Sequence, residues 1–179
     1  TKQDLPDKCA RRGNKLEGLK EKDLIGIPWM LAFALRADGW YLRQDIIWNK
    51  PNPMPESVRD RCTKSHEYIF LLSKNQNYYF NVDAIKEPTR RKRSVWNITK
   101  KGYRDAHFAV YPPDLIIPCI KAGSEKNDII LDPFMGSGTT AMVAKNLGRY
   151  YIGCELHEDY GNLIKNRIGE VRGTLEKFL

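Results

Sequence analysis

The chain has 179 residues, 41% of them hydrophobic, which is enough to bury one ordinary core, so we expect a single domain. No uninterrupted apolar run approaches the roughly 18 residues of a membrane-spanning helix, so we expect no membrane span. The formal net charge of +8 suits a polyanionic partner such as nucleic acid, although a generally basic protein has the same balance.

The four cysteines, Cys9, Cys62, Cys119 and Cys154, are scattered, with neither a Cys-x-x-Cys pair nor a zinc-binding spacing. Reduced thiols are therefore favoured over disulfides. The first 20 residues are polar, lack the apolar stretch of a secretory signal and do not begin with Met. We expect a loop or frayed terminus there.

The first half of the chain predicts one helix and three strands. A buried helix is expected over Ile27–Ala37, followed by a strand over Trp40–Trp48 that is rich in β-branched and aromatic residues. Asn49–Ser57 contains three prolines in five residues and predicts an extended loop. His66–Lys74 and Asn77–Val82 predict two further strands, and the short link between them favours a hairpin.

A basic linker is expected between Lys86 and Arg104, and a helix follows it. This helix starts at Pro112-Pro113 and takes Gly123 as its C-cap. Pro118 lies inside the helix, so a kink or a break is expected at that point.

The C-terminal part predicts a strand over Asp128–Asp132, a helix over Gly138–Leu147 capped by Gly148, a strand over Tyr150–Glu155, and a closing helix from about Glu158 to Val171. Strand, helix and strand form a βαβ unit. The predicted fold class is therefore α/β, with a parallel sheet covered by helices on both faces.

The strongest motif is "GSGTTA" at residues 136–141, which satisfies G-x-G-x-x-G/A between a predicted strand and helix. Alone it also fits a tight turn without a ligand. Glu155, at the end of the next strand, can accept hydrogen bonds from ribose hydroxyls. No lysine follows the glycines, as a phosphate-binding loop requires, and Asp132 would repel a pyrophosphate. A cationic nucleoside without phosphate, such as S-adenosylmethionine, fits these features better than a dinucleotide.

The segments "LDPFMGSGTT" and "GCEL" resemble the cofactor loop and ribose-binding segment of the amino-methylating DNA methyltransferases. "KDLIGIPWMLAFALRADGWYLRQDIIWNKPNPMPES", "TKSHEYIFLLSK" and "HFAVYPPDLI" also resemble segments of this family, in the same order. The resemblance extends from Gly18 to about Arg167. It implies a Rossmann-like S-adenosylmethionine-dependent methyltransferase sheet, incomplete at its N-terminal side. The cofactor-binding residues that it implies are Tyr111, Pro112, Asp132, Pro133, Phe134, Gly136, Ser137, Gly138, Thr139 and Glu155.

The order of the segments resembles the permuted class, in which the catalytic half precedes the cofactor half. We expect residues 21–82 to belong to the catalytic half, residues 86–106 to form a short basic target-recognition insert, and residues 107–171 to form the cofactor-binding half. In this family a tetrapeptide of Asp, Asn or Ser, then Pro-Pro and an aromatic residue, positions the amine of the flipped base.

That tetrapeptide is not found in the chain. The only Pro-Pro pair stands in "YPPD", in reversed order, and its position indicates a helix start, so Asp114 is not predicted to be catalytic. We expect the motif to lie upstream of "KDLIGIPW", and the chain to be a C-terminal part of the enzyme. Its catalytic residues are therefore unknown, and stand-alone activity is in doubt.

The predicted insert carries eight Lys or Arg against one Glu between residues 86 and 104, with Trp96 and Tyr103 interleaved. The predicted DNA-binding residues are Arg90, Arg91, Lys92, Arg93, Lys100 and Lys101, mostly toward phosphates. The loop "NKPNPMPESVRDR" is equally consistent with a DNA-facing segment and a rigid surface loop. His66 and His157 are expected to be structural or solvated.

The sequence thus predicts a DNA methyltransferase that transfers a methyl group from S-adenosylmethionine to the exocyclic amine of adenine or cytosine, without a metal. A restriction-modification or phage system and a cytoplasmic location are expected. The partners are double-stranded DNA and either a second copy of the chain or a complementing N-terminal half. Two alternatives remain, a nicotinamide-dependent oxidoreductase and a non-catalytic DNA-binding module.

Overall fold

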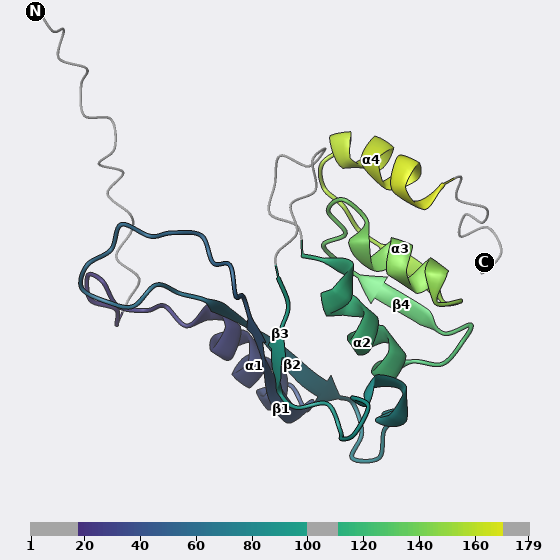
Figure 1. Ribbon diagram of the computed structural model, residues 1–179, viewed down its shortest axis with the longest axis horizontal. Coiled ribbons are helices and arrows are strands. Elements are labelled where there is room, and N and C mark those ends of the chain that lie inside the picture. The colour runs from purple at the N-terminus through teal and green to yellow at the C-terminus, as the bar shows by residue number, and fades with distance from the viewer. Residues whose placement is uncertain (1–17, 100–110, 170–179) are drawn as a thin grey trace, which may run out of the picture.

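The computed structural model describes residues 18–99 and 111–169 of the chain (Figure 1). Among these residues, no helix is long and apolar enough to cross a membrane. The elements, in chain order, are α1 (Ile27–Ala37), β1 (Tyr41–Asn49), β2 (His66–Ser73), the 3-10 helix η1 (Asp83–Ile85), β3 (Val95–Asn97), α2 (Pro113–Gly123), β4 (Ile129–Asp132), α3 (Thr139–Asn146), β5 (Tyr150–Gly153) and α4 (Asp159–Ile168).

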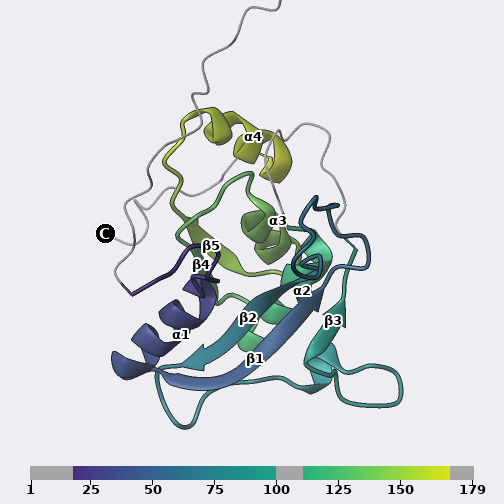
Figure 2. The ribbon, with the colours of Figure 1, turned by 90° about the vertical axis from the view of Figure 1, so that its left-hand side faces the viewer.

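The first sheet has the strand order β2-β1-β3, with β2 antiparallel and β3 parallel to β1. Alternate side chains of β2 point to opposite faces. Tyr68 and Phe70 contact Trp29 of α1, with ring centroids 5.3 and 5.0 Å away. Ile69 packs instead against the cluster of Trp48, Trp96 and Leu115, which includes α2. Helices therefore cover both faces of this sheet (Figure 2).

Two predictions about this half are wrong. Asn77–Val82 is not a strand, and β2 pairs with β1 rather than forming a hairpin with the segment after it. The backbone N–H of Asn81 donates to the Ala122 carbonyl of α2 at 2.8 Å, so this segment docks on a helix instead of a strand. The strand that does form, β3, is only three residues long and lies inside the predicted basic linker.

The second sheet contains β4 and β5, which are parallel and joined through α3, as the βαβ prediction requires. Ile129 pairs with Tyr150 and Asp132 pairs with Gly153. Each predicted element is present within a few residues of its expected bounds. Leu147 is the C-cap of α3, and Gly148 follows it with φ 73°. The predicted end of the closing helix, Val171, lies outside the described residues.

Helix α2 connects the two sheets. Leu115 packs against Trp48 and Trp96 of the first sheet, whereas Ile120 packs against Val143 and Ala144 of α3. The helix begins at the proline pair, as predicted, but it continues without a break through Pro118. Pro118 lacks the backbone N–H that would donate to the Asp114 carbonyl, which lies in the first turn of the helix. Its C-cap is Ser124 rather than Gly123.

The second sheet is covered on one face only within the described residues. Ile130 and Tyr151 pack against α2 and α3, while the side chains on the opposite face are exposed. These exposed side chains are Ile129, Leu131, Tyr150 and Ile152. A strand pair with one bare apolar face is consistent with the predicted incomplete sheet.

Candidate cofactor site

The glycine loop joins the carboxyl end of β4 to the first turn of α3. Gly138 is the N-cap of α3 with φ 81°, a left-handed conformation that glycine adopts without strain. A Cβ at this position would lie 3.3 Å from Ile164, so α4 packs directly on the turn. The loop is therefore held between β4 and α4, with the backbone amides of the first helical turn at its end.

Asp132, the last residue of β4, is the centre of a hydrogen-bond network. One carboxylate oxygen accepts the backbone N–H of Phe134 at 3.0 Å. The other accepts the hydroxyls of Thr140 at 2.6 Å and Tyr111 at 3.1 Å, and these two hydroxyls are themselves 2.6 Å apart. Burial, together with the nearby Asp132 carboxylate, raises the pKa of Tyr111 to about 12. Tyr111 thus keeps its proton and fixes the Asp132 carboxylate from the α2 side.

Glu155 lies just beyond β5 and reaches across to the glycine loop. Its two carboxylate oxygens accept the backbone N–H groups of His157 at 2.9 Å and Gly136 at 2.7 Å. These hydrogen bonds, that of His157 first, hold the pKa of the Glu155 carboxyl below its usual range. The ionised carboxylate therefore stands at the mouth of the loop, at the edge where parallel strands bind ligands.

Apolar side chains flank this carboxylate. Phe134 is 86% exposed and Leu156 is 92% exposed. The backbone N–H of Met135 donates to the Cys154 carbonyl at 2.8 Å, which holds the two segments together. Exposed aromatic and aliphatic side chains beside a carboxylate suit a flat base attached to a ribose.

Several predicted cofactor residues are buried rather than open. Pro112 is fully buried, and the side chains of Ser137 and Thr139 are nearly so. Ser137 accepts a hydrogen bond from the Arg167 guanidinium of α4 at 2.8 Å. In this structure the side chains of Ser137 and Thr139 are buried, so any contact that they make with a ligand is through the backbone or after a rearrangement.

Sequence reasoning missed Thr140, Arg167 and the contact between Gly153 and Met135. A Cβ on Gly153 would lie only 1.8 Å from the Met135 methyl group, so β5 needs glycine where the buried Met135 crosses it. A glycine inside a strand is a known signal of such a close approach. The hydrogen bonds of Thr140 to Tyr111 and of Arg167 to Ser137 join residues 29 and 30 positions apart, so no local sequence pattern signals them.

Comparison with known proteins places this geometry in a family. Residues 9–166 match the profile of the DNA methylase family, which spans most of the chain. The chain belongs to this family of amino-methylating DNA methyltransferases. The type II methyltransferase M.Cfr9I of Citrobacter freundii is 52% identical over 164 residues, covering 89% of this chain and 55% of the relative. M.SmaI of Serratia marcescens is 57% identical over 159 residues, which cover 85% of this chain and 54% of the relative.

A solved structure supports the fold. The crystal structure of the M1.HpyAVI–SAM complex has a TM-score of 0.64 and 31% identity, covering 81% of this chain and 71% of that one. The fold is therefore that of the S-adenosylmethionine-dependent methyltransferases, as the sequence predicts. The chain spans about half the length of the curated methyltransferases that it matches.

The basic insert of this methylase chain is only partly described. Arg90 donates to Glu87 at 2.5 Å, and the Lys92 ammonium lies over the Trp96 ring, 4.9 Å from its centroid. Arg91 and Arg93 are exposed, as are Lys86 and Arg90. Lys100 and Lys101 lie outside the described residues.

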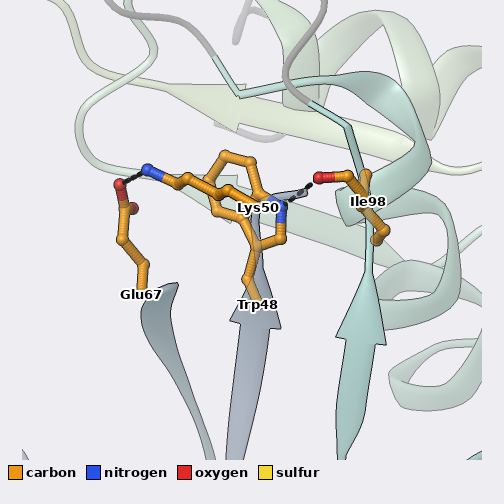
Figure 3. Close-up of polar contacts among 4 residues, drawn as sticks. All are labelled: Trp48, Lys50, Glu67 and Ile98. Carbon is orange, nitrogen blue, oxygen red and sulfur yellow. Dashed lines mark hydrogen bonds and ion pairs between the residues drawn. The ribbon is translucent and has the colours of Figure 1, made fainter. Parts of the chain in front are cut away.

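The carboxyl end of β1 holds a second polar cluster of the methylase chain. Figure 3 shows the Lys50 ammonium pairing with Glu67 while it lies 4.5 Å from the Trp48 ring centroid. The Trp48 indole N–H donates to the Ile98 carbonyl at 2.8 Å, which anchors β1 beside the chain after β3 (Figure 3). This cluster fixes the start of the proline-rich loop that follows.

The proline-rich loop leads to a cavity of about 910 Å³ lined by Lys22 and residues 57–61. Arg61 pairs with Glu56 and Lys22 pairs with Asp60, so the lining mixes both signs of charge. Its role, DNA-facing or structural, stays a prediction. His66 contacts Tyr68 at 3.4 Å, as a structural histidine would.

Among the described residues, the three cysteines, Cys62, Cys119 and Cys154, are unpaired. Burial raises the pKa of the Cys119 thiol to about 11. Cys119 packs against the cluster of Trp48, Trp96 and Leu115.

Proposed function

We propose that the chain carries the cofactor-binding half and part of the DNA-contacting surface of an S-adenosylmethionine-dependent DNA methyltransferase. The reaction is methylation of an exocyclic amine of adenine or cytosine. One observation supports this most strongly. The Glu155 carboxylate and the Asp132 carboxylate are both fixed by backbone N–H groups around one glycine loop. Two ordered anions at this edge favour a cationic nucleoside over a phosphate.

The residues present fit S-adenosylmethionine. Glu155 offers acceptors for two ribose hydroxyls, and ligand binding would exchange its bond to Gly136 for bonds to the ribose. Phe134 and Leu156 offer apolar surface for the adenine. Asp132 keeps one oxygen with a single donor, which suits an ammonium or a water that binds it. The M1.HpyAVI structure, 31% identical, is a complex with this cofactor.

When bound, the cofactor supplies an activated methyl group. The residues of this chain hold it, orient it and exclude water from one side. A target amine must be flipped out of the duplex, and its hydrogens must be accepted so that its lone pair faces the methyl group. The tetrapeptide that performs this step in the family is not present in the 179 residues. The chemical step therefore needs further polypeptide.

The proposed macromolecular substrate is double-stranded DNA, within a type II restriction-modification system. The exposed arginines of the basic insert, Arg91 and Arg93, would neutralise phosphates. The relatives M.Cfr9I and M.SmaI are named as type II methyltransferases. This supports the restriction-modification setting.

Calorimetric titration of the chain with S-adenosylhomocysteine and, separately, with a nicotinamide dinucleotide tests the ligand class. We expect saturable binding of S-adenosylhomocysteine only. Binding of the dinucleotide alone would favour the oxidoreductase alternative and refute the proposal.

A further inference from the structure

The last turn of α4 lies against the glycine loop. Arg167 belongs to that turn, and its guanidinium contacts Ser137, which stands 30 positions earlier in the chain. One nitrogen, Nη1, donates to the Ser137 hydroxyl at 2.8 Å and to the Ser137 carbonyl oxygen at 3.4 Å. Ser137 is only 3% exposed, so water competes little for this contact. A hydrogen bond from a charged donor in such surroundings is a strong one.

The loop needs support at this point because of its two glycines. Ser137 stands between Gly136, with φ 53°, and Gly138, with φ 81°. Glycine has access to more backbone conformations than any other residue, so the peptide groups on both sides of Ser137 can turn at little cost. Contacts from outside therefore set the shape of the turn. Glu155 holds the N–H of Gly136 from the β5 side, and Arg167 holds Ser137 from the α4 side.

Cofactor binding is expected to change one of these two contacts and not the other. The proposed exchange of the Glu155 carboxylate from Gly136 to the ribose releases the Gly136 N–H. The hydroxyl of Ser137 is buried against α4, and its bond to Arg167 is not consumed by the ribose. Arg167 would therefore still hold the turn when Glu155 no longer does.

Packing of α4 holds Arg167 itself in place. A Cβ on Gly138 would lie 3.3 Å from Ile164 and 3.4 Å from Ile168, so these two side chains rest on the turn just above and below Arg167 in the helix. Lys145 of α3 donates to the Ile168 carbonyl at 2.6 Å, which satisfies a carbonyl group at the end of α4. The guanidinium is thus positioned by a docked helix turn.

A role in the helix dipole alone does not account for this placement. Lys165 occupies the same last turn from an exposed position, where a cation interacts favourably with the helix terminus. Arg167 reaches a nearly buried acceptor instead. It also lies near the network around Asp132: burial raises the pKa of Tyr111 to about 12, and the Arg167 guanidinium opposes that rise.

We infer that Arg167 is a positioning residue for the cofactor: it fixes Ser137, so that the glycine loop keeps its shape while Glu155 turns to the ribose. This inference rests on the proposed function, because it takes the ligand of the loop to be S-adenosylmethionine. It extends the candidate site to α4, whose side chains need not touch the cofactor to determine its affinity.

The test compares Arg167→Met with Arg167→Lys in the full chain. Methionine keeps an unbranched stem without a donor, whereas lysine keeps one charged nitrogen, and Arg167 makes both contacts through one nitrogen. In calorimetry, Arg167→Met is expected to weaken S-adenosylhomocysteine binding by about tenfold and Arg167→Lys by less than about threefold. Lys165→Met removes the same charge from the same turn and is expected to change affinity by less than about threefold.

Hydrogen exchange in the ligand-free chain gives an independent readout. The Gly138 N–H donates to the Met135 carbonyl at 3.0 Å and closes the turn. Its exchange is expected to accelerate by about tenfold in Arg167→Met and to stay unchanged in Arg167→Lys and Lys165→Met. The Gly148 N–H, beyond the other end of α3, is the internal control.

Equal losses of affinity in Arg167→Met and Arg167→Lys would overturn the inference, because they would mean that the donor at Ser137 does not matter. Wild-type affinity or unchanged Gly138 exchange in Arg167→Met would overturn it as well. A wild-type chain that binds no S-adenosylhomocysteine would refute the proposed function. The exchange rates would then still decide whether Arg167 holds the loop.

Discussion

The charged side chains of the two halves of the molecule have different hydrogen-bond partners. In the β4–α3–β5 unit, the carboxylates are fixed by the backbone: Asp132 by Phe134 and Glu155 by Gly136 and His157. In the β2–β1–β3 half, charged side chains pair with one another at the surface, as Lys22 does with Asp60. Backbone donors are held by the fold, whereas exposed ion pairs contribute little and are easily exchanged.

This difference indicates that the two halves bind different kinds of ligand. A site of fixed carboxylates is preorganised for one small ligand of defined shape. A surface of exposed, exchangeable cations suits a long polyanion whose phosphates can be contacted in many ways. Cofactor affinity is therefore expected to depend on single fixed carboxylates. DNA affinity is expected to depend on the sum of several exposed cations.

The largest effect is expected at Glu155. Glu155→Ala removes the acceptor at the mouth of the loop and should lower S-adenosylhomocysteine affinity by about 100-fold, since bonds to a charged acceptor are the strong ones. Calorimetry measures this loss. Glu158→Ala, a nearby exposed carboxylate, is the control and should leave affinity within about 3-fold. Equal effects of the two changes would mean that only net charge matters.

Gly153→Ala tests whether the crossing of β5 and Met135 holds the loop. The added methyl group overlaps the Met135 side chain, so we expect a destabilisation of about 1–3 kcal/mol in urea unfolding. In a Met135→Ala variant, Gly153→Ala should lower the free energy of unfolding by less, because the Met135 side chain that it would overlap is absent. Additive effects of the two changes would contradict the contact.

The contribution of the basic insert to DNA affinity is expected to depend on the number of positive charges that it carries. Replacing both Arg91 and Arg93 with alanine should weaken DNA binding by about tenfold and reduce the salt slope by about 1.8. Replacing Lys20 and Lys126 removes the same charge elsewhere and is the control. Salt-dependent binding to a duplex measures both. An unchanged slope for the arginine pair would place the DNA surface elsewhere.

The smallest effect is expected at Tyr111. Tyr111→Phe removes one donor to Asp132 and should cost about 1 kcal/mol of unfolding free energy. The folded pKa of about 12 lies above the usual value of 10.0, so this contribution is complete below pH 10 and disappears as the pH rises toward 12. Stability curves of the two proteins should approach each other and cross within that range, since about two pH units of linkage exceed about 1 kcal/mol. Tyr150→Phe, at an exposed tyrosine, should leave the curve unchanged.

Local patterns in the sequence predict the βαβ unit and its ligand edge, because strand, glycine turn and helix follow one another within 26 residues, from Asp128 to Gly153. They also place α1 within its observed bounds. The strand β3 was missed because three residues carry no alternation that can be recognised. The Asn77–Val82 segment was misassigned because its aromatic content predicts a strand, while its backbone bonds to α2.

The hydrogen bonds that hold the site together could not be predicted from the sequence, because they join residues that are far apart in it. Tyr111 was predicted to serve the cofactor site, but its hydrogen bonds to Asp132 and Thr140 span 21 and 29 positions, which no periodicity encodes. The same holds for Arg167 and Ser137. Motifs identify which residue types meet a ligand, and tertiary packing decides which of them hold the others in place.

We infer that the cofactor site lies within this chain and that the residues that position the target amine do not. One assay tests both parts: the chain alone is incubated with tritiated S-adenosylmethionine and duplex DNA of mixed sequence, and label is measured on protein by filter binding and on DNA. We predict saturable binding of S-adenosylmethionine to the protein and no transfer of label to DNA. Robust methylation by the chain alone would contradict it.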